Sequence, residues 1–292
     1  MRTEPKPSPI APARIHAFVD GLFAADLHAK RVASLADATL GTVNAASLSI
    51  HAIGRGLAAV KGLDDKHAIK QVDRCIGNEG IDIEALAPAW VRDQIAGRQD
   101  LVVNLDWTEF EADDQSMLVL SSQTSHGRAV PLLWKTVVRS QLKNRRNDHE
   151  DDLLRRFREI VPIDVRVTVV ADRGFSDQKL FDFLGDELGF DFIIRFRGVV
   201  HVTSREGETR AARDWIPGRG RTRMLRDARV TADRCLVGTV VLAHDKDMDE
   251  PWCLAVGGSD RNAAEVKRLY GKRFTCEETF RDIKDLHFGF GM

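Results

Sequence analysis

The feature that most constrains the fold is a change in hydrophobic pattern at Leu101. Three runs rich in β-branched and apolar residues follow, separated by short polar turns: LVVNLDWTEF, SMLVLSSQT and RAVPLLWKTVV. Runs of this length and composition, bounded by polar residues, are typical of β-strands joined by short turns. The segment therefore predicts a three-stranded antiparallel meander.

The next segment predicts helices that alternate with strands. NDHEDDLLRRFREIV has the pattern of a charged amphipathic helix, and VRVTVVADRGF follows as a nearly continuous apolar strand. A strand without polar alternation is buried on both faces, as in the centre of a mixed sheet. A second helix, with Ser176 expected as its N-cap, and the strand DFIIRFR complete the order β-β-β-α-β-α-β. This order predicts an α/β fold, a ribonuclease-H-like mixed sheet.

The alternation of helices and strands ends at about Gly198, where a β-rich insertion is expected. Between Arg195 and Arg229 the chain carries ten arginines against four acidic residues, a local charge of +6 in a chain whose net charge is -1. Strands that carry arginines suit contact with phosphates, and a solvated loop region is the alternative. The strand PWCLAVGG and one long helix then follow.

Residues from about 15 to 78 predict a helical N-terminal region. One helix, DDKHAIKQVDRCIGN, would place basic side chains, among them Lys70 and Arg74, opposite an apolar side that includes Ile76. Gly62 just precedes this helix, so a helix-turn-helix is possible. A helical bundle with solvated charges explains the same pattern, and both interpretations stay open.

Composition excludes several other classes of protein. The four cysteines are scattered, without a CxxC pair or a histidine at zinc-finger spacing, which predicts reduced core residues. No apolar run approaches the ~18 residues of a membrane span, and the proline-rich start lacks the apolar centre of a signal peptide. We therefore expect a soluble, cytoplasmic protein that makes no contact with a membrane.

Three carboxylates occupy positions that suit metal-dependent chemistry. Asp106 lies where alternation in the first strand predicts an apolar residue, Asp172 ends the buried strand, and Glu277 is on the last helix. In a ribonuclease-H-like sheet the strands of Asp106 and Asp172 are neighbours. Carboxylates that lie close together repel unless a cation separates them, and Mg²⁺ or Mn²⁺ prefers their oxygens. A strand-end aspartate before Arg-Gly is also a common turn former, so Asp172 alone does not decide the matter.

The last helix offers a geometric argument. At ~100° per residue, Tyr270, Arg273, Glu277 and Lys284 fall within ~60° of one another and would form one stripe on a continuous helix. Arg273 and Lys284 could then hold phosphates while Glu277 binds metal. An ordinary amphipathic helix with mixed charge has the same appearance.

The combined motifs resemble a known family. The spacing of Tyr270, Arg273, Glu277 and Lys284 is similar to the signature of bacterial insertion-sequence DDE transposases of the IS-four family. IKQVDRCIGN, LDWTEF, VVADRGF, IRFRG and YGKRFTCEETFRDIKDLHFGFG look like segments of that family's tetracycline-transposon branch, in the same order. The resemblance covers roughly residues 69–292.

The resemblance implies a function and a division into domains. Family members use two Mg²⁺ ions, or Mn²⁺, to cut double-stranded DNA at transposon ends, form and open a hairpin, and join the end to target DNA, acting as a homodimer near the nucleoid. It implies Asp106, Asp172 and Glu277 as catalytic metal ligands. Residues implied in DNA binding are Tyr270, Arg273, Lys284, Trp252, Lys70 and Arg74. The expected parts are a disordered tail (1–14), a helical end-binding region (15–95), a catalytic core (96–197 and 250–292) and the basic insertion (198–249).

Two expectations remain beside this one. In the family a tryptophan like Trp252 stacks on a flipped base, whereas a buried core tryptophan is the alternative here. Relatives also continue well past the GFGM at which this sequence stops, which predicts a shortened open reading frame. An inactive or regulatory DNA-binding remnant, or a ribonuclease-H-like nuclease without strand transfer, is therefore the alternative function.

Overall fold

The computed structural model describes residues 10–290 except 232, 234 and 259. These residues form two compact units, one of residues 10–94 and 281–290 and the other of residues 95–280. The first nine residues of the expected tail lie outside the described residues, and the first helix begins at Pro12. Each unit is described by itself.

The first unit is helical. Its helices are α1 (Pro12–Phe23), α2 (Ala29–Ala45), α3 (Ile50–Lys61), α4 (Asp65–Ile76) and most of α5 (Ile83–Ile95). Their apolar faces share one core, in which Leu40, Leu57 and Val72 are almost fully buried. Asp37 is also buried, where Lys61 Nζ and Gln71 Nε2 both donate to its carboxylate at 2.8 Å.

The α4 helix buries only part of the apolar side that the sequence suggested, since Val72 is buried as expected and Ile76 is not. Ala68, Val72 and Cys75 are buried, whereas Ile76, expected towards the core, is 61% exposed. The buried stripe therefore follows the small residues Ala68 and Cys75, which let α4 approach its neighbours closely. Lys70 and Arg74 remain exposed on the other side, as predicted.

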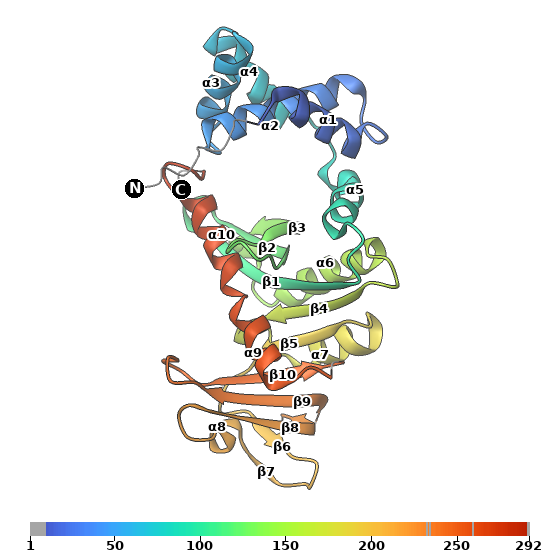
Figure 1. The fold of residues 1–292 in the computed structure, drawn as a ribbon, viewed down its shortest axis with the longest axis vertical. Coiled ribbons are helices and arrows are strands. Elements are labelled where there is room, and N and C mark those ends of the chain that lie inside the picture. Colours follow the sequence, from blue (N-terminus) through green and yellow to red (C-terminus); the bar gives the residue numbers. More distant parts are fainter. Residues whose placement is uncertain (1–9, 232, 234, 259, 291–292) are drawn as a thin grey trace, which may run out of the picture. The chain divides into compact units, whose positions relative to one another are not determined.

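The second unit is built on a mixed sheet of ten strands in the described chain (Figure 1). The strands are β1 (Asp100–Phe110), β2 (Gln115–Ser122), β3 (Val130–Val138), β4 (Arg166–Ala171), β5 (Asp191–Arg195), β6 (His201–Thr203), β7 (Thr209–Ala211), β8 (Arg221–Val230), β9 (Cys235–His244) and β10 (Trp252–Gly257). Their order across the sheet is β3-β2-β1-β4-β5-β10-β9-β8-β6-β7.

The central strands confirm the predicted fold class. β1 to β3 form the antiparallel meander, and β4 lies parallel to both β1 and β5. The strands β4 and β5 are buried along nearly their whole length, as their apolar, β-branched sequences predict. The result is a ribonuclease-H-like α/β sheet. The strands of the insertion, β6 to β9, extend this same sheet beyond β10.

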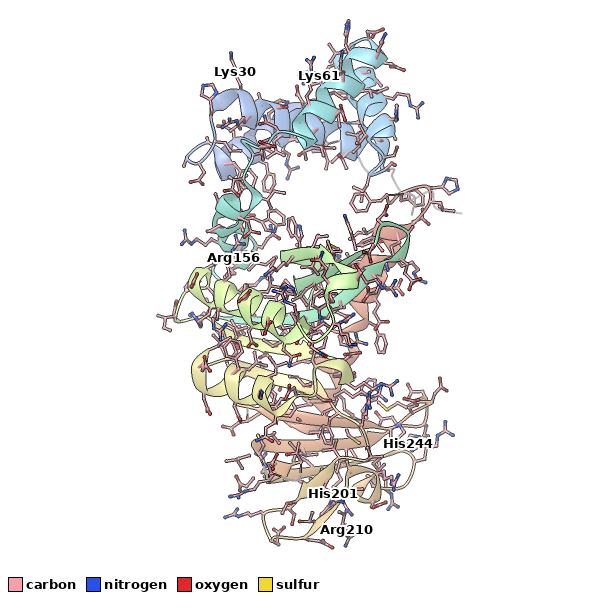
Figure 2. All side chains as sticks on the ribbon, turned by 180° about the vertical axis from the view of Figure 1, so that it is seen from behind. Lys30, Lys61, Arg156, His201, Arg210 and His244 are labelled. Atoms are coloured by element: carbon pink, nitrogen blue, oxygen red, sulfur yellow. The ribbon has the colours of Figure 1, made fainter. Side chains whose placement is uncertain are left out.

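Helices cover both faces of the sheet. The remaining helices are α6 (Arg146–Ile160), α7 (Gln178–Asp182), α8 (Ala212–Trp215), α9 (Ala263–Gly271) and α10 (Phe274–Lys284). Figure 1 shows α9 in front of the sheet, and Figure 2, from behind, shows α6 and α7 on the opposite face. The α9 residues Val266, Leu269 and Tyr270 are buried against Val170, Val241 and Leu254 of the sheet.

Two predicted details of these helices were wrong. The helix after β4 starts from Asp177, whose side chain accepts from Lys179 N, and Ser176 instead donates to Arg173 O at 2.9 Å. It then ends in a π-helical turn from Phe183 to Glu187. The long C-terminal helix is also divided in two, because α9 ends at Gly271 and α10 begins at Phe274.

Candidate functional site

Two of the predicted acids follow neighbouring parallel strands at the same level. β1 and β4 pair with Leu105 opposite Ala171, so Asp106 and Asp172 are the next residues along each strand. Asp106 still lies inside β1, opposite Val119 of β2, whereas Asp172 leaves the sheet. The carboxyl ends of parallel strands are where α/β sheets present functional groups. The strand register thus brings these two acids side by side.

The turn after β4 fixes the side chain of Asp172. Its Oδ1 atom accepts a hydrogen bond from Gly174 N at 2.7 Å. A Cβ atom on residue 174 would lie 3.0 Å from that same oxygen, a tight contact that glycine avoids. Asp172 therefore forms the Asx-type turn that its sequence context suggests, and its other oxygen is left over for a different partner.

Arg273 brings Asp106 and Glu277 together. Its Nη1 atom donates to Asp106 Oδ2 at 3.0 Å and its Nη2 atom to Glu277 Oε1 at 2.5 Å. The Arg273 side chain is 8% exposed and that of Asp106 is 15% exposed. A guanidinium thus lies between an acid of the sheet and an acid of α10.

Burial shapes the electrostatics of this group. Burial raises the pKa of Asp106 to about 6, and the nearby Asp172 and Glu277 charges act in the same direction, while Arg273 and the Cys276 thiol oppose them. Burial would lower the pKa of Arg273, but Tyr270, Asp106 and Glu277 outweigh it and raise that pKa. Arg273 is therefore a permanent cation between two carboxylates, those of Asp106 and Glu277.

The break between α9 and α10 gives Arg273 its position. Arg273 N bonds to Tyr270 O at 3.0 Å, three residues back, and so the regular helical pattern is interrupted there. Leu269 O accepts a hydrogen bond from Gln123 Nε2 at 3.0 Å. Tyr270 and Glu277 therefore belong to different helices, and the single stripe expected from a continuous helix was wrong.

Tyr270 and Trp252, both predicted to contact DNA, contact each other. Their rings meet edge to face, with centroids 4.8 Å apart at 70°. Tyr270 is 1% exposed, and burial raises the pKa of its hydroxyl. Trp252 is half-buried at the start of β10. Stacking of either ring on a DNA base stays a prediction.

The three carboxylates are suitable ligands for a divalent metal ion, but they are not arranged to hold one. Carboxylate oxygens are the ligands that Mg²⁺ and Mn²⁺ prefer. Within the part of the chain that the structure describes, no three or more His, Cys, Asp or Glu side chains are grouped so that they could hold a metal ion. Arg273 fills the space between two of the acids. As they stand, the residues do not fit the metal site.

The predicted DNA-binding residues of α4 line a basic hollow in the first unit. Lys70 and Arg74 border a cavity of about 460 Å³ together with Lys30 and Arg31 from the first turn of α2, and with His67. Figure 2 labels Lys30, which follows the His28 N-cap of that helix. The sequence did not single out Lys30 and Arg31, because only the packing of α2 against α4 brings them to Arg74.

Other residues near the acids were also missed. Cys276 donates from its thiol to Asp106 Oδ2 at 3.4 Å, whereas the sequence predicted only that it is a reduced core residue. Beside Asp172, the exposed Arg173 and Arg197 line both a hollow of about 750 Å³ and one of about 200 Å³. Arginine-rich sequence pointed to the region but not to this convergence.

Lys284 is the last residue of α10 and belongs to the first unit. Its predicted contact with phosphate therefore remains a prediction. The four cysteines are buried and free, as predicted. Among the described residues, no helix has the length and apolar character needed to cross a membrane.

The sheet order and the helices on both faces define this chain as a ribonuclease-H-like α/β protein. A family model described as "Transposase DDE domain" matches residues 99–292. The chain belongs to that family. This membership supports the transposase prediction at the level of the family, whose members act on DNA and generally use divalent metal ions.

Other comparisons contribute less. No curated protein matches the chain. Among solved structures, the chain is similar to Marinitoga piezophila Argonaute with 5′ OH guide RNA, at 9% identity and a TM-score of 0.27 over 76% of this chain and 34% of that one. A second Argonaute structure, with guide RNA and target DNA, gives 7% identity and a TM-score of 0.24 over 71% of this chain and 30% of that one. This chain thus spans about a third of those chains, and the assignment rests on the family match and the sheet order.

Proposed function

We propose that this protein is a cut-and-paste transposase of an insertion sequence, of the IS-four type and its tetracycline-transposon branch. Asp106, Asp172 and Glu277 are its catalytic acids. The observation that carries the proposal is their convergence: register sets Asp106 beside Asp172, and Arg273 ties Asp106 to Glu277. Burying charged groups from distant parts of the chain around one cation costs folding free energy. Such an arrangement therefore favours a functional role for these acids.

The proposed cofactor is Mg²⁺, as two ions, with Mn²⁺ as a substitute. Bound divalent ions would supply the activation of water and the stabilisation of the leaving oxygen in phosphodiester cleavage. The protein's own contribution is to present three carboxylates in a partly dry site.

The proposed DNA contacts divide between the units. In the second unit, Arg273 and Tyr270 contact phosphate and Trp252 stacks on a base. Lys284, at the end of α10 in the first unit, is a further phosphate contact. In the first unit, Lys70 and Arg74 hold the backbone of a transposon end through the basic hollow of α2 and α4. Basic side chains around a concave surface favour this role, because phosphate neutralisation supplies most of the affinity for DNA.

The proposed reaction sequence is cleavage at each inverted-repeat end, hairpin formation and opening, and strand transfer to target DNA. A homodimer paired with two ends would perform it in the cytoplasm, at the nucleoid. Purified protein with Mg²⁺ and a plasmid that carries the flanking inverted repeats tests the proposal. Excision with hairpin intermediates supports it.

The same assay separates the alternatives. Nicking without end specificity indicates a ribonuclease-H-like nuclease, and binding without cleavage indicates a DNA-binding remnant. Asp172→Asn is the control for the acids, because it keeps the Gly174 hydrogen bond geometry while removing the charge. Cleavage that persists in this variant contradicts the assignment of Asp172.

A further inference from the structure

Arg273 occupies the place that a cation shared by Asp106 and Glu277 must take. Its two terminal nitrogens contact one oxygen of each acid, at 3.0 Å and 2.5 Å. The rings of Tyr270 and Phe274 flank the guanidinium, with centroids 5.9 Å and 5.1 Å from its central carbon. The space between the two acids is thus filled by the Arg273 side chain.

The oxygens of Asp106 are already engaged. Oδ2 accepts from Arg273 and, at 3.4 Å, from the Cys276 thiol, while Oδ1 accepts from Trp107 N at 2.9 Å. A divalent cation that reached Oδ2 would lie within contact distance of the guanidinium. Two like charges at such a distance in a buried site repel strongly, so a metal ion and the guanidinium cannot both lie beside Asp106 Oδ2.

The guanidinium is nevertheless incompletely satisfied. Its Nε atom is buried and has no hydrogen-bond partner among the described residues. A phosphate group can accept two parallel hydrogen bonds from a guanidinium, and a third donor adds to such a contact. Movement of Arg273 onto a DNA phosphate would therefore satisfy a donor that has no partner among the described residues.

We propose that Arg273 is an internal counter-ion that keeps divalent metal out of the acid site, and that DNA phosphate admits the metal by drawing Arg273 away. The inference rests on the proposed function of the three acids as metal ligands. It makes metal and DNA binding reciprocal: whatever factor DNA adds to metal affinity, metal adds to DNA affinity. The protein would then bind metal chiefly when DNA is already bound.

The first test measures Mg²⁺ affinity by calorimetry without DNA, in the wild type and in Arg273→Gln. Glutamine removes the competing charge and leaves two adjacent carboxylates uncompensated. We expect the variant to bind Mg²⁺ about tenfold more tightly, within the ~5–150-fold range of typical site coupling. Arg268→Gln is the matched control, because it removes an exposed arginine of α9 and should leave the affinity unchanged.

The second test follows Arg273 itself. Tyr270 is the single tyrosine of the sequence, so 3-fluorotyrosine incorporation gives one ¹⁹F resonance beside the guanidinium. We expect saturating Mg²⁺ to shift this resonance in the wild type, and a short DNA duplex to raise Mg²⁺ affinity more in the wild type than in Arg273→Gln. If glutamine prevents folding, Arg273→Met serves in its place, because it also removes the charge while keeping a long unbranched side chain, and its Mg²⁺ affinity should rise as well.

The outcomes are distinguishable. Equal or weaker Mg²⁺ binding by folded Arg273→Gln overturns the inference, as does an unshifted resonance at saturating Mg²⁺, because Arg273 then stays with the acids. Either result leaves the proposed transposase function intact if cleavage is observed. Failure of every variant, with and without DNA, to bind Mg²⁺ overturns both the inference and the metal site on which it rests.

Discussion

Replacement of Asp106 by asparagine should stabilise the metal-free protein while removing its activity. The folded pKa of Asp106 is raised from 3.8 to about 6, chiefly by burial. One pKa unit corresponds to about 1.36 kcal/mol, so the ionised carboxylate costs the fold roughly 3 kcal/mol. Asparagine has a similar shape without the charge. We expect it to raise the free energy of unfolding by roughly 1–3 kcal/mol near pH 7.5.

The sign of the pH dependence follows from the same shift. An acid whose pKa is raised on folding holds more protons in the folded state between the two pKa values, so stability falls as the pH rises from about 4 to about 6. Above that window the loss is complete. The advantage of Asp106→Asn should therefore be full near pH 7.5 and shrink towards zero near pH 4.

The assay is thermal and urea unfolding in EDTA at several pH values. A gain of this size should raise the melting temperature by several degrees. Asp113→Asn is the matched control, because it removes an exposed carboxylate from the turn that follows β1 and should change little. An Asp106→Asn variant that is no more stable than wild type near neutral pH, or whose gain does not depend on pH, refutes the reasoning.

Three further outcomes are expected. Asp172→Ala should abolish DNA cleavage while circular dichroism remains native, because Asp172 is half-buried at the end of β4 and its loss leaves the core intact; cleavage above background in a gel assay would contradict this. Lys70→Ala and Arg74→Ala should each weaken binding to end DNA and reduce the slope of log affinity against log salt by about one, as measured by fluorescence anisotropy. Thr279→Val should lower stability by ~1 kcal/mol in urea unfolding, since the Thr279 hydroxyl accepts from Ala129 N and donates to Ala129 O; unchanged stability would show that these bonds contribute nothing.

The central sheet could be predicted because its constraints are local. The polar turns of the meander and the unbroken apolar run of β4 each specify a strand with few alternatives, and a parallel β1–β4 pair follows from the helix between them. The joining of the insertion to the central sheet depends instead on the antiparallel pairing of β9 with β10, whose register no local sequence signal specifies.

The site was less predictable for a similar reason. Alternation and strand-end position were enough to select Asp106 and Asp172. The break at Gly271 was not, since a glycine inside a helical pattern is usually tolerated. On a continuous helix Arg273 would lie on the same stripe as Tyr270. Spacing alone therefore could not predict that Arg273 forms ion pairs with both Asp106 and Glu277. Buried ion pairs are set by tertiary packing, which no single-helix argument contains.

The acids differ in how firmly the fold holds them, and this difference bears on how the site could change state. Asp106 and Asp172 are fixed by ladder hydrogen bonds of the sheet and by the turn at Gly174. Glu277 is carried by α10, whose first turns attach to the second unit through Ala129, which donates to Thr275 O at 3.2 Å and to the Thr279 hydroxyl at 3.0 Å. Its side chain is 46% exposed, and Arg273 is its ion-pair partner. Release of Arg273 would therefore free Glu277 as well. Glu277, rather than Asp106 or Asp172, is then the acid that moves when a cation of different size replaces the guanidinium.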